Sequence, residues 1–521
     1  MLPISTIACS RRTTRPALSW CSIRRHRGKC SGPSALLSKH LTIIWLLTAL
    51  LSPLAGGEGA IAGTDGNKVP DVRNIPFHDQ VFVDQGLVGA GQLPADTIDF
   101  LGDTLGSFSS LKIAPGSWRR VGDHYEGILW TLPDRGRNDP AAKLFFDYPA
   151  RLNRFRLRFT PGDGQLTFTP DGGLKLRDFD GRPFTGADPA AGTKTERGII
   201  LPAPADGTGM GKISLDAESL QFTRDGHFYI GDEYTANIYY FDRGGKLRGV
   251  IRPPAAVMPM SNGRPYFGSL QAPDTGRRNN QGPEGLSISP DGHRLFVVLQ
   301  SALVQDSATG NAAGRINSRV LIYDISRTPT PSQPIAHHVV KLPAYDKDGK
   351  GQRPDRTAAQ SEILAIDDHR FLMLARDAAG RGADPKTPIV YKKILLVDVS
   401  HATNIAGLPY ENDTISLLQD PAGTALKPDI VPAEHGELID MLNPVQLARF
   451  GLSVDALSEK WEAMDLVPTL QPGRPGDYFL LVGNDNDFIA RHCRMSGQSC
   501  DSDLDNDNRI LVYQVRLPAP S

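Results

Sequence analysis

Hydrophobic and polar positions alternate over short stretches of this chain, and turn residues separate the stretches. The segment 277–303, RRNNQGPEGLSISPDGHRLFVVLQSAL, shows the pattern most clearly. A short apolar run after Glu284 meets the turn Pro290-Asp-Gly, and a second run over 295–299 ends at the polar pair Gln300 and Ser301. Two such runs around a Pro/Asp/Gly turn predict a β-hairpin.

The same unit recurs along the chain in a fixed order. An inner strand is followed by a turn, a second strand with a polar exit, and a third strand. A fourth, more variable strand is expected at 247–252, 335–342 or 413–418. The repeated units span 219–242, 284–325, 361–398 and 461–515, with a less regular first unit at 108–159.

Repeated four-stranded antiparallel units at intervals of roughly 60 to 100 residues are typical of a β-propeller. We therefore predict an all-β propeller of five to six four-stranded blades, with a possible sixth blade hidden in 160–212. The last unit lacks a fourth strand, and a strand within 69–91, around residues 81–83, is expected to close the ring. The alternative, a pair of β-sandwiches, predicts no repeat order. Helical spacing predicts a short helical insertion at 434–463, on Leu438, Met441, Leu442, Val445 and Leu447.

The first 62 residues have the composition of a secretory signal peptide. Residues 1–40 carry eight Lys/Arg and no acid, an apolar core follows at 41–51, and small residues end at Ala60-Ile-Ala. The alternatives are a signal anchor or a transit peptide, but the apolar run is short for a membrane span of about 20 residues. The sequence predicts a signal peptide over 1–62, a single domain over 63–521, and a secreted or periplasmic protein without stable membrane insertion. The true start codon stays open.

Removal of this leader changes the charge and the cysteine count. The mature chain would carry 49 Lys/Arg against 57 Asp/Glu, a net charge of −8. Such an acidic chain is a poor candidate for binding nucleic acid, and we expect a monomer. Cys493 and Cys500 would be the remaining cysteines, and in an exported protein they favour a small-loop disulfide.

The repeats place carboxylates at equivalent positions. Each of four units begins its inner strand with a glutamate, and the second strands end in polar residues. Because the inner strands of a propeller line its central channel, we expect these groups to meet at one mouth. The inner-strand glutamates are Glu218, Glu284, Glu362 and Glu462, and the exits include Asp134/Arg135, Asp232/Glu233, Arg376/Asp377 and Asp485/Asp487.

Crowded carboxylates need protons, cationic partners or a metal. Oxygen ligands of this kind suit Ca²⁺, which takes six to eight of them. The alternative is that each glutamate caps its own turn, with Arg135 and Arg376 as ion-pair partners or anion-binding forks. A separate run, DSDLDNDN at 501–508, resembles the start of a calcium loop but has Asn506 and Val512 where an EF-hand needs Gly and Glu, so a solvated loop is favoured over local calcium binding.

The motifs GPEGLSISPDG, IGDEY, SEILAIDD, LRDFDGRPFTGADP and LLVGNDNDF together resemble the phytase-like family described as having esterase-like activity of phytase. The similarity covers most of 105–515. It implies an exported propeller and, by analogy with calcium-dependent propeller phytases, hydrolysis of phosphate esters. The sequence departs from the pattern at Ser219 and Ala463, where glycine is commoner after the glutamate.

Two hypotheses follow. The first is an exported calcium-dependent hydrolase of a small anionic phosphate or carboxylate ester. Glu284, Glu362, Arg376 and Arg135 are its candidate catalytic residues, the two arginines clamping the anion. The candidate metal ligands are Glu218, Asp232, Glu233, Glu284, Glu362, Glu462, Asp485 and Asp487. The second hypothesis is a non-catalytic exported propeller that binds a ligand or protein partner, with calcium only as a staple.

Overall fold

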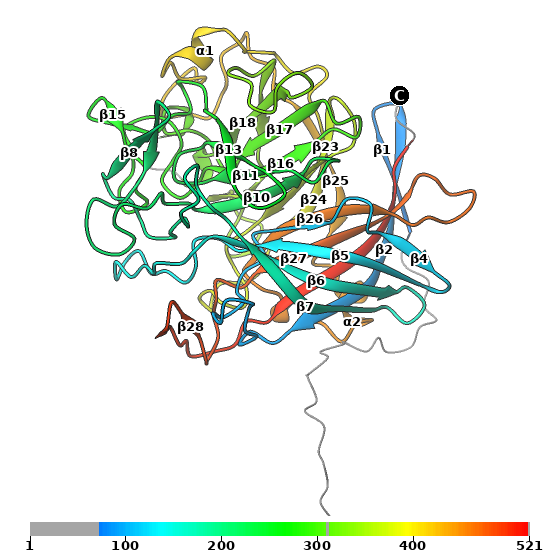
Figure 1. Ribbon diagram of the computed structural model, residues 1–521. Coiled ribbons are helices and arrows are strands. Elements are labelled where there is room, and N and C mark those ends of the chain that lie inside the picture. Colours follow the sequence, from blue (N-terminus) through cyan, green and yellow to red (C-terminus); the bar gives the residue numbers. More distant parts are fainter. Residues whose placement is uncertain (1–71, 309–311, 519–521) are drawn as a thin grey trace, which may run out of the picture. The chain divides into compact units, whose positions relative to one another are not determined.

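The computed structural model describes residues 72–308 and 312–518, which lie within one compact unit, 57–521 (Figure 1). The predicted signal peptide lies outside the described residues. The described chain is nearly all β, with many sheets and few helices, which confirms the all-β part of the predicted fold class. Within it, no helix is long and apolar enough to cross a membrane.

Three separate four-stranded antiparallel sheets follow the repeat order read from the sequence. We call them the second, third and fourth units. The predicted fourth strands at 247–252 and 335–342 are confirmed, but that at 413–418 is wrong. The second unit is β10(Ala217–Phe222), β11(Phe228–Asp232), β12(Ile238–Phe241) and β13(Leu247–Ile251); the third is β16(Pro283–Ile288), β17(Arg294–Leu299), β18(Asn317–Asp324) and β19(Ala336–Lys341); the fourth is β22(Ala359–Ala365), β23(Arg370–Arg376), β24(Lys392–Asp398) and β25(Glu434–Asp440).

A ten-stranded sheet contains two further four-stranded runs, which we call the first and fifth units. One parallel pairing, Ala90 with Gln165, joins them. The first is β3(Ser110–Ile113), β5(His124–Leu132), β6(Arg151–Thr160) and β7(Gln165–Lys175), with β4(Arg119–Val121) at its edge; the fifth is β26(Lys460–Pro468), β27(Asp477–Asp485), β30(Asn508–Arg516) and β2(Gln80–Leu93).

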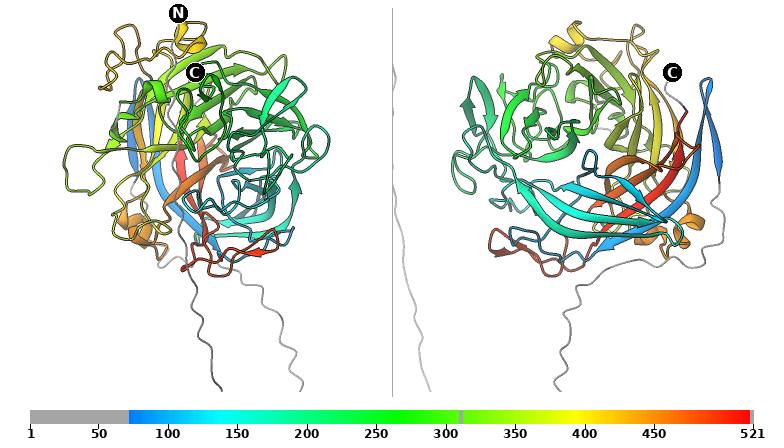
Figure 2. Two further views of the ribbon diagram at one scale, coloured as in Figure 1. Left: turned by 90° about the vertical axis from the view of Figure 1, so that its left-hand side faces the viewer. Right: turned by 45° about the vertical axis from the view of Figure 1, so that its right-hand side comes forward.

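The N-terminal strand completes the fifth unit, as predicted. β2 pairs antiparallel with β30, from Val83 opposite Arg516 to Leu93 opposite Asn508, and Figure 2 shows the two strands side by side. The single strand expected over 69–91 is instead a hairpin, in which β1(Arg73–Phe77) folds back on β2. The first and last parts of the described chain are therefore held in one sheet.

The inner strands β3, β10, β16, β22 and β26 contact one another in that order, and β26 contacts β3 again. An apolar cluster fills each contact between neighbouring units of the described chain. Burial of these side chains is the main source of stability between the sheets. Representative pairs are Leu152 and Phe228, Tyr229 and Leu295, Phe296 and Phe371, Leu374 and Trp461, and Phe159 and Phe479.

The predicted helical insertion is only partly correct. Residues 434–440, with Leu438, form β25 rather than helix, because their backbone pairs with β24 while Leu438 and Ile439 are buried in an apolar cluster. A short helix, α2(Pro444–Ala448), follows. The Asn443 side chain caps it by accepting the N–H groups of Val445 and Gln446.

Residues 160–212 hold β7 and a two-stranded hairpin in place of a sixth four-stranded unit. The remaining short elements lie in connections. They are β8(Thr193–Glu196), β9(Ile199–Pro202), β14(Met260–Ser261), β15(Arg264–Pro265), β20(Ala344–Tyr345), β21(Arg356–Thr357), β28(Arg494–Met495), β29(Gln498–Ser499), α1(Pro409–Asn412) and the 3₁₀ turns Val304–Asp306, Ala312–Gly314 and Val454–Ala456. The predicted disulfide joins Cys493 and Cys500.

Candidate functional site

A β-bulge at the start of the inner strand sets the direction of three of the four predicted glutamates. The pairing of β10 with β11 skips Glu218, that of β16 with β17 skips Glu284, and that of β26 with β27 skips Glu462. A bulged residue is left unpaired in the ladder and its side chain is re-aimed. These three glutamates are thereby freed from the ladder at equivalent positions of their sheets.

The fourth unit breaks this pattern. There the pairing of β22 with β23 skips Ser361, and Glu362 is back in register opposite Leu374. A shift of one residue turns a side chain to the other face of the sheet. Glu362 therefore does not share the position of the three bulged glutamates. Its carboxylate instead contacts Lys112 Nζ at 3.1 Å and accepts the Ser110 hydroxyl at 2.7 Å.

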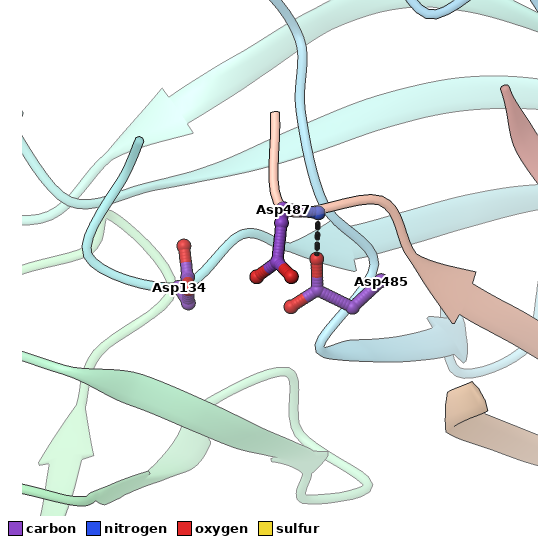
Figure 3. A group of neighbouring side chains, drawn as sticks. All are labelled: Asp134, Asp485 and Asp487. Carbon is purple, nitrogen blue, oxygen red and sulfur yellow. Dashed lines mark hydrogen bonds between the residues drawn. The ribbon is translucent and has the colours of Figure 1, made fainter. Parts of the chain in front are cut away.

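Two carboxylate groups share one residue, Asp134. In each group, one oxygen per residue lies within 4.8 Å of the others. The first group is Asp134, Asp485 and Asp487, which converge from two separate chain segments (Figure 3). The second is Asp134, Asp216 and Glu218. Asp134 therefore lies where two candidate cation positions meet.

Three cations lie among these acids. Arg135 Nη1 is 2.8 Å from Asp216 Oδ2, Lys460 Nζ is 2.7 Å from Asp487 Oδ1, and Arg376 forms an ion pair with Glu462. The carboxylates still outnumber the cations. We call this set the mouth cluster: Asp134, Asp216, Glu218, Glu233, Glu284, Glu462, Asp485 and Asp487 with Arg135, Arg376 and Lys460.

The two arginines predicted to clamp an anion already contact groups of the protein. Arg135 is 5% and Arg376 4% exposed, and besides their carboxylate partners Arg135 donates to Asn280 and Arg376 to Ser361. This geometry favours the alternative reading of both arginines as ion-pair partners.

Burial shifts the protonation of the cluster. It raises the pKa of Asp134 to about 7 and that of Asp216 to about 7. Burial and then the neighbouring carboxylates raise the pKa of Glu218 and Glu284 well above the ordinary range. Burial also acts on Asp487, but the Lys460 ammonium lowers its pKa below the usual value. The cluster thus holds protons at neutral pH unless a cation replaces them.

The other predicted ligands differ in how free their oxygens are. Asp232 accepts the backbone N–H groups of Tyr234 and Thr235 and so caps its own turn, a role that the sequence suggested only for the inner-strand glutamates. Glu233 Oε1 accepts the Gly282 N–H at 3.1 Å, and Glu284 Oε1 accepts from Gln300. Among the described residues, the second oxygens of Glu233 and Glu284 are buried without a hydrogen-bond partner. Burying such a carboxylate oxygen costs free energy unless it carries a proton or contacts a cation.

Sequence reasoning missed Asp216 and Lys460. Each lies two residues before a bulged glutamate, Asp216 before Glu218 and Lys460 before Glu462. This fixed spacing from the repeated glutamate could have identified both residues from the sequence. Asp134 was recognised as a strand exit but not as a ligand.

The aspartate-rich run 501–508 has the properties of a structural loop. Asp501 accepts the Cys493 N–H, Asp507 accepts the Ala95 N–H, and Asp505 pairs with Arg491. These contacts support the solvated-loop interpretation over a calcium loop.

The raised pKa values predict an unusual pH dependence of stability. A carboxyl whose pKa rises from about 4 in the unfolded chain to about 7 when folded binds more protons in the folded state between those values. The free energy of unfolding then decreases as pH rises through that window. We expect the melting temperature, measured in a chelator, to fall from pH 4 to pH 8, and to fall less in Asp134→Asn. A melting temperature that rises across this window would contradict the assignment.

Comparison with known proteins places these features in a family. The family described as Phytase-like, esterase-like activity of phytase, matches residues 104–488. An uncharacterized secreted protein of Arthroderma benhamiae is 33% identical over 505 residues, which cover 88% of this chain and 97% of that protein.

Solved structures give only distant likenesses. An ancestral GH74 enzyme aligns with a TM-score of 0.30 and 11% identity, over 87% of this chain and 49% of its own. The major Malassezia sympodialis allergen Mala s 1 aligns with a TM-score of 0.28 and 9% identity, over 87% and 96%. Both scores are too low to carry an argument about fold or function.

Proposed function

The chain belongs to the family described as Phytase-like, esterase-like activity of phytase, and from this premise we propose that it is an exported, calcium-dependent hydrolase of phosphate or other esters. The observation that carries the proposal is the pair of carboxylate groups sharing Asp134. Its substrate would be a small anionic ester, and the protein would act as a monomer.

The architecture proposed for this activity is a propeller of five blades, one for each four-stranded unit. The cyclic order of contacts among the inner strands supports it, as does the closure of the fifth unit by β2. In this arrangement the bulged glutamates face the central channel, and the exits of the second strands lie at the same mouth.

Export is proposed on three grounds. The leader has the composition of a signal peptide, the Arthroderma relative is described as secreted, and Cys493 and Cys500 form a disulfide of the kind found in oxidising compartments.

The donor set fits calcium. It consists of carboxylate oxygens from separate segments, and Ca²⁺ prefers such hard ligands and accepts irregular geometry. Asp134, Asp485 and Asp487 would hold one ion, and Asp134, Asp216 and Glu218 a second. When bound, Ca²⁺ would supply positive charge that polarises the ester and acidifies water.

Within the mouth cluster, Glu284 would serve as the proton donor. Glu284 is 2% exposed, its Oε2 has no hydrogen-bond partner among the described residues, and its pKa is raised by burial and by Glu462. A carboxyl with a raised pKa is suited to act as a general acid, so Oε2 could donate a proton to the leaving-group oxygen. Gln300, which donates to Oε1, would fix the orientation of that carboxyl.

A second candidate function is non-catalytic binding of a ligand or protein partner, with calcium as a staple. The low exposure of the carboxylates favours it: Asp134 is 6% and Asp485 1% exposed. A site this closed is suited to holding an ion, and catalysis would require the substrate to reach it from the mouth.

Hydrolysis assays separate the two candidates. We expect the wild type to hydrolyse p-nitrophenyl phosphate or p-nitrophenyl acetate with CaCl₂ and to lose this activity in EDTA. Glu284→Gln should lower kcat by about 10²–10⁴-fold, the usual contribution of a general acid, whereas Glu126→Gln, near the start of β5 and paired with Arg119, should not change it. Activity that survives both EDTA and Glu284→Gln would reject the metal-dependent mechanism. No turnover by a folded, calcium-binding protein would favour the binding function.

A further inference from the structure

A second group of metal-ligating side chains lies at the tip of the N-terminal hairpin, away from the mouth cluster. A cavity of about 380 Å³ there is lined by three histidines from three segments, His78, His369 and His401, together with Asp398. His78 comes from the β1–β2 turn, His369 from the β22–β23 turn, and His401 from the loop after β24. We call this set the histidine pocket.

The spacing around His78 is too long for hydrogen bonds. Its Nε2 is 3.8 Å from Asp398 Oδ2 and 3.6 Å from Glu434 Oε2, whereas N–H···O bonds cluster near 2.9–3.0 Å. Ligands held at about 2.0–2.2 Å by one tetrahedral ion are separated from each other by about 3.4 Å. The His78 and His401 rings are also close, with centroids 6.2 Å apart.

The register of the fourth unit adds a reason for a cation. Asp398 and Glu434 lie directly opposite each other on β24 and β25, and like charges in that position destabilise a sheet. Asp398 is nearly buried, with 8% of its side chain exposed, so its charge is poorly screened by solvent. Arg370 lies opposite Asp398 on β23 and lines the same cavity, but its guanidinium forms an ion pair with Asp367. A cation beside Asp398 and Glu434 would remove the repulsion that is left.

The backbone at His78 is also unusual. Its φ is +55° at the first position of a two-residue hairpin turn, where glycine is usually favoured. The chain therefore places an imidazole at a position that disfavours most side chains. With this turn, His78 at the hairpin tip lies beside Asp398 and Glu434 of the fourth unit. An ion pair between Arg73 on β1 and Glu437 on β25 also joins the hairpin to that unit.

We propose that the histidine pocket binds Zn²⁺ through His78, His401 and Asp398, with Glu434 or His369 as a further ligand. Imidazole and carboxylate together suit zinc, whereas the all-oxygen mouth cluster suits calcium. Among the described residues only the mouth carboxylates already have all their ligand atoms within 4.8 Å. The histidine pocket closes by rotation of Glu434, which is 62% exposed, and of the loop histidines. The bound ion fastens the β1–β2 hairpin to the fourth unit.

Zinc titration by calorimetry tests this inference on the full mature chain, with excess CaCl₂ present to occupy the mouth cluster. We expect one Zn²⁺ per chain and a rise in melting temperature. His78→Asn, which tolerates the positive φ, and His401→Ala should each weaken binding by at least about 10-fold. His293→Ala, at an exposed turn of the third unit, is the matched control and should bind as the wild type does.

Cobalt gives a second readout that does not depend on stability. Co²⁺ in the histidine pocket should produce visible absorption bands of a site with nitrogen ligands, and these bands should be lost in His78→Asn and His401→Ala. Absence of zinc binding in the wild type, or wild-type binding in both variants, would overturn the proposal. So would complete displacement of zinc by calcium.

Discussion

Asp134→Asn is expected to abolish calcium binding at both carboxylate groups and, with it, ester hydrolysis. Asp134 is the one residue common to the two sets, so loss of its charge removes a ligand from each. The amide keeps the shape of the carboxyl, and its oxygen can still accept the Gly136 N–H that Asp134 accepts at 3.0 Å. We therefore expect a folded protein with calcium affinity reduced by at least about 100-fold, measured by calorimetry and by p-nitrophenyl ester hydrolysis.

Single-group variants sharpen this test. Asp485→Asn removes a ligand from the first group and Asp216→Asn from the second, so each should abolish one binding event and leave the other. Asp225→Asn, at an exposed turn, is the control. Calcium affinity of Asp134→Asn within about twofold of the wild type would show that Asp134 is not a calcium ligand and would overturn the assignment of both groups.

Much of the fold could be predicted because each unit repeats one local pattern. Alternating apolar residues and the Pro290-Asp-Gly turn specify a hairpin, and Gly292 adopts the φ of +88° that only glycine takes readily. The closure by β2 could be predicted because the fifth unit is visibly one strand short. The position of β25 could not, because a long connection separates it from β24 and its apolar residues merge with those of α2.

The site was harder to predict because the pairing register between the first two strands of each unit determines which side chains face it. The motifs around Glu284 and Glu362 are nearly the same in sequence, PEGL and SEIL. The bulge falls on Glu284 in one and on Ser361 in the other, which sends Glu362 to Lys112. Which residue a sheet leaves unpaired depends on packing between units, and that information is not local.

Arg376→Met is expected to cost about 3–5 kcal/mol of the free energy of unfolding, because it leaves the Glu462 carboxylate buried without its charge partner. Arg376 and Glu462 are 4% and 2% exposed, so solvent cannot replace the lost partner. This result would assign Arg376 to the stability of the mouth rather than to the binding of a substrate anion. Chemical denaturation of apo protein measures it.

The double variant Arg376→Met/Glu462→Met completes the cycle. Replacing a whole buried ion pair by apolar side chains is often neutral or stabilising, so we expect the double variant to recover most of the loss. The coupling energy then reports the ion pair itself. If Arg376 instead serves the substrate, Arg376→Met should leave stability near the wild type and raise KM for the phosphate ester more than for the acetate ester. Because the two outcomes move different quantities, one pair of variants decides between an ion-pair partner and an anion clamp.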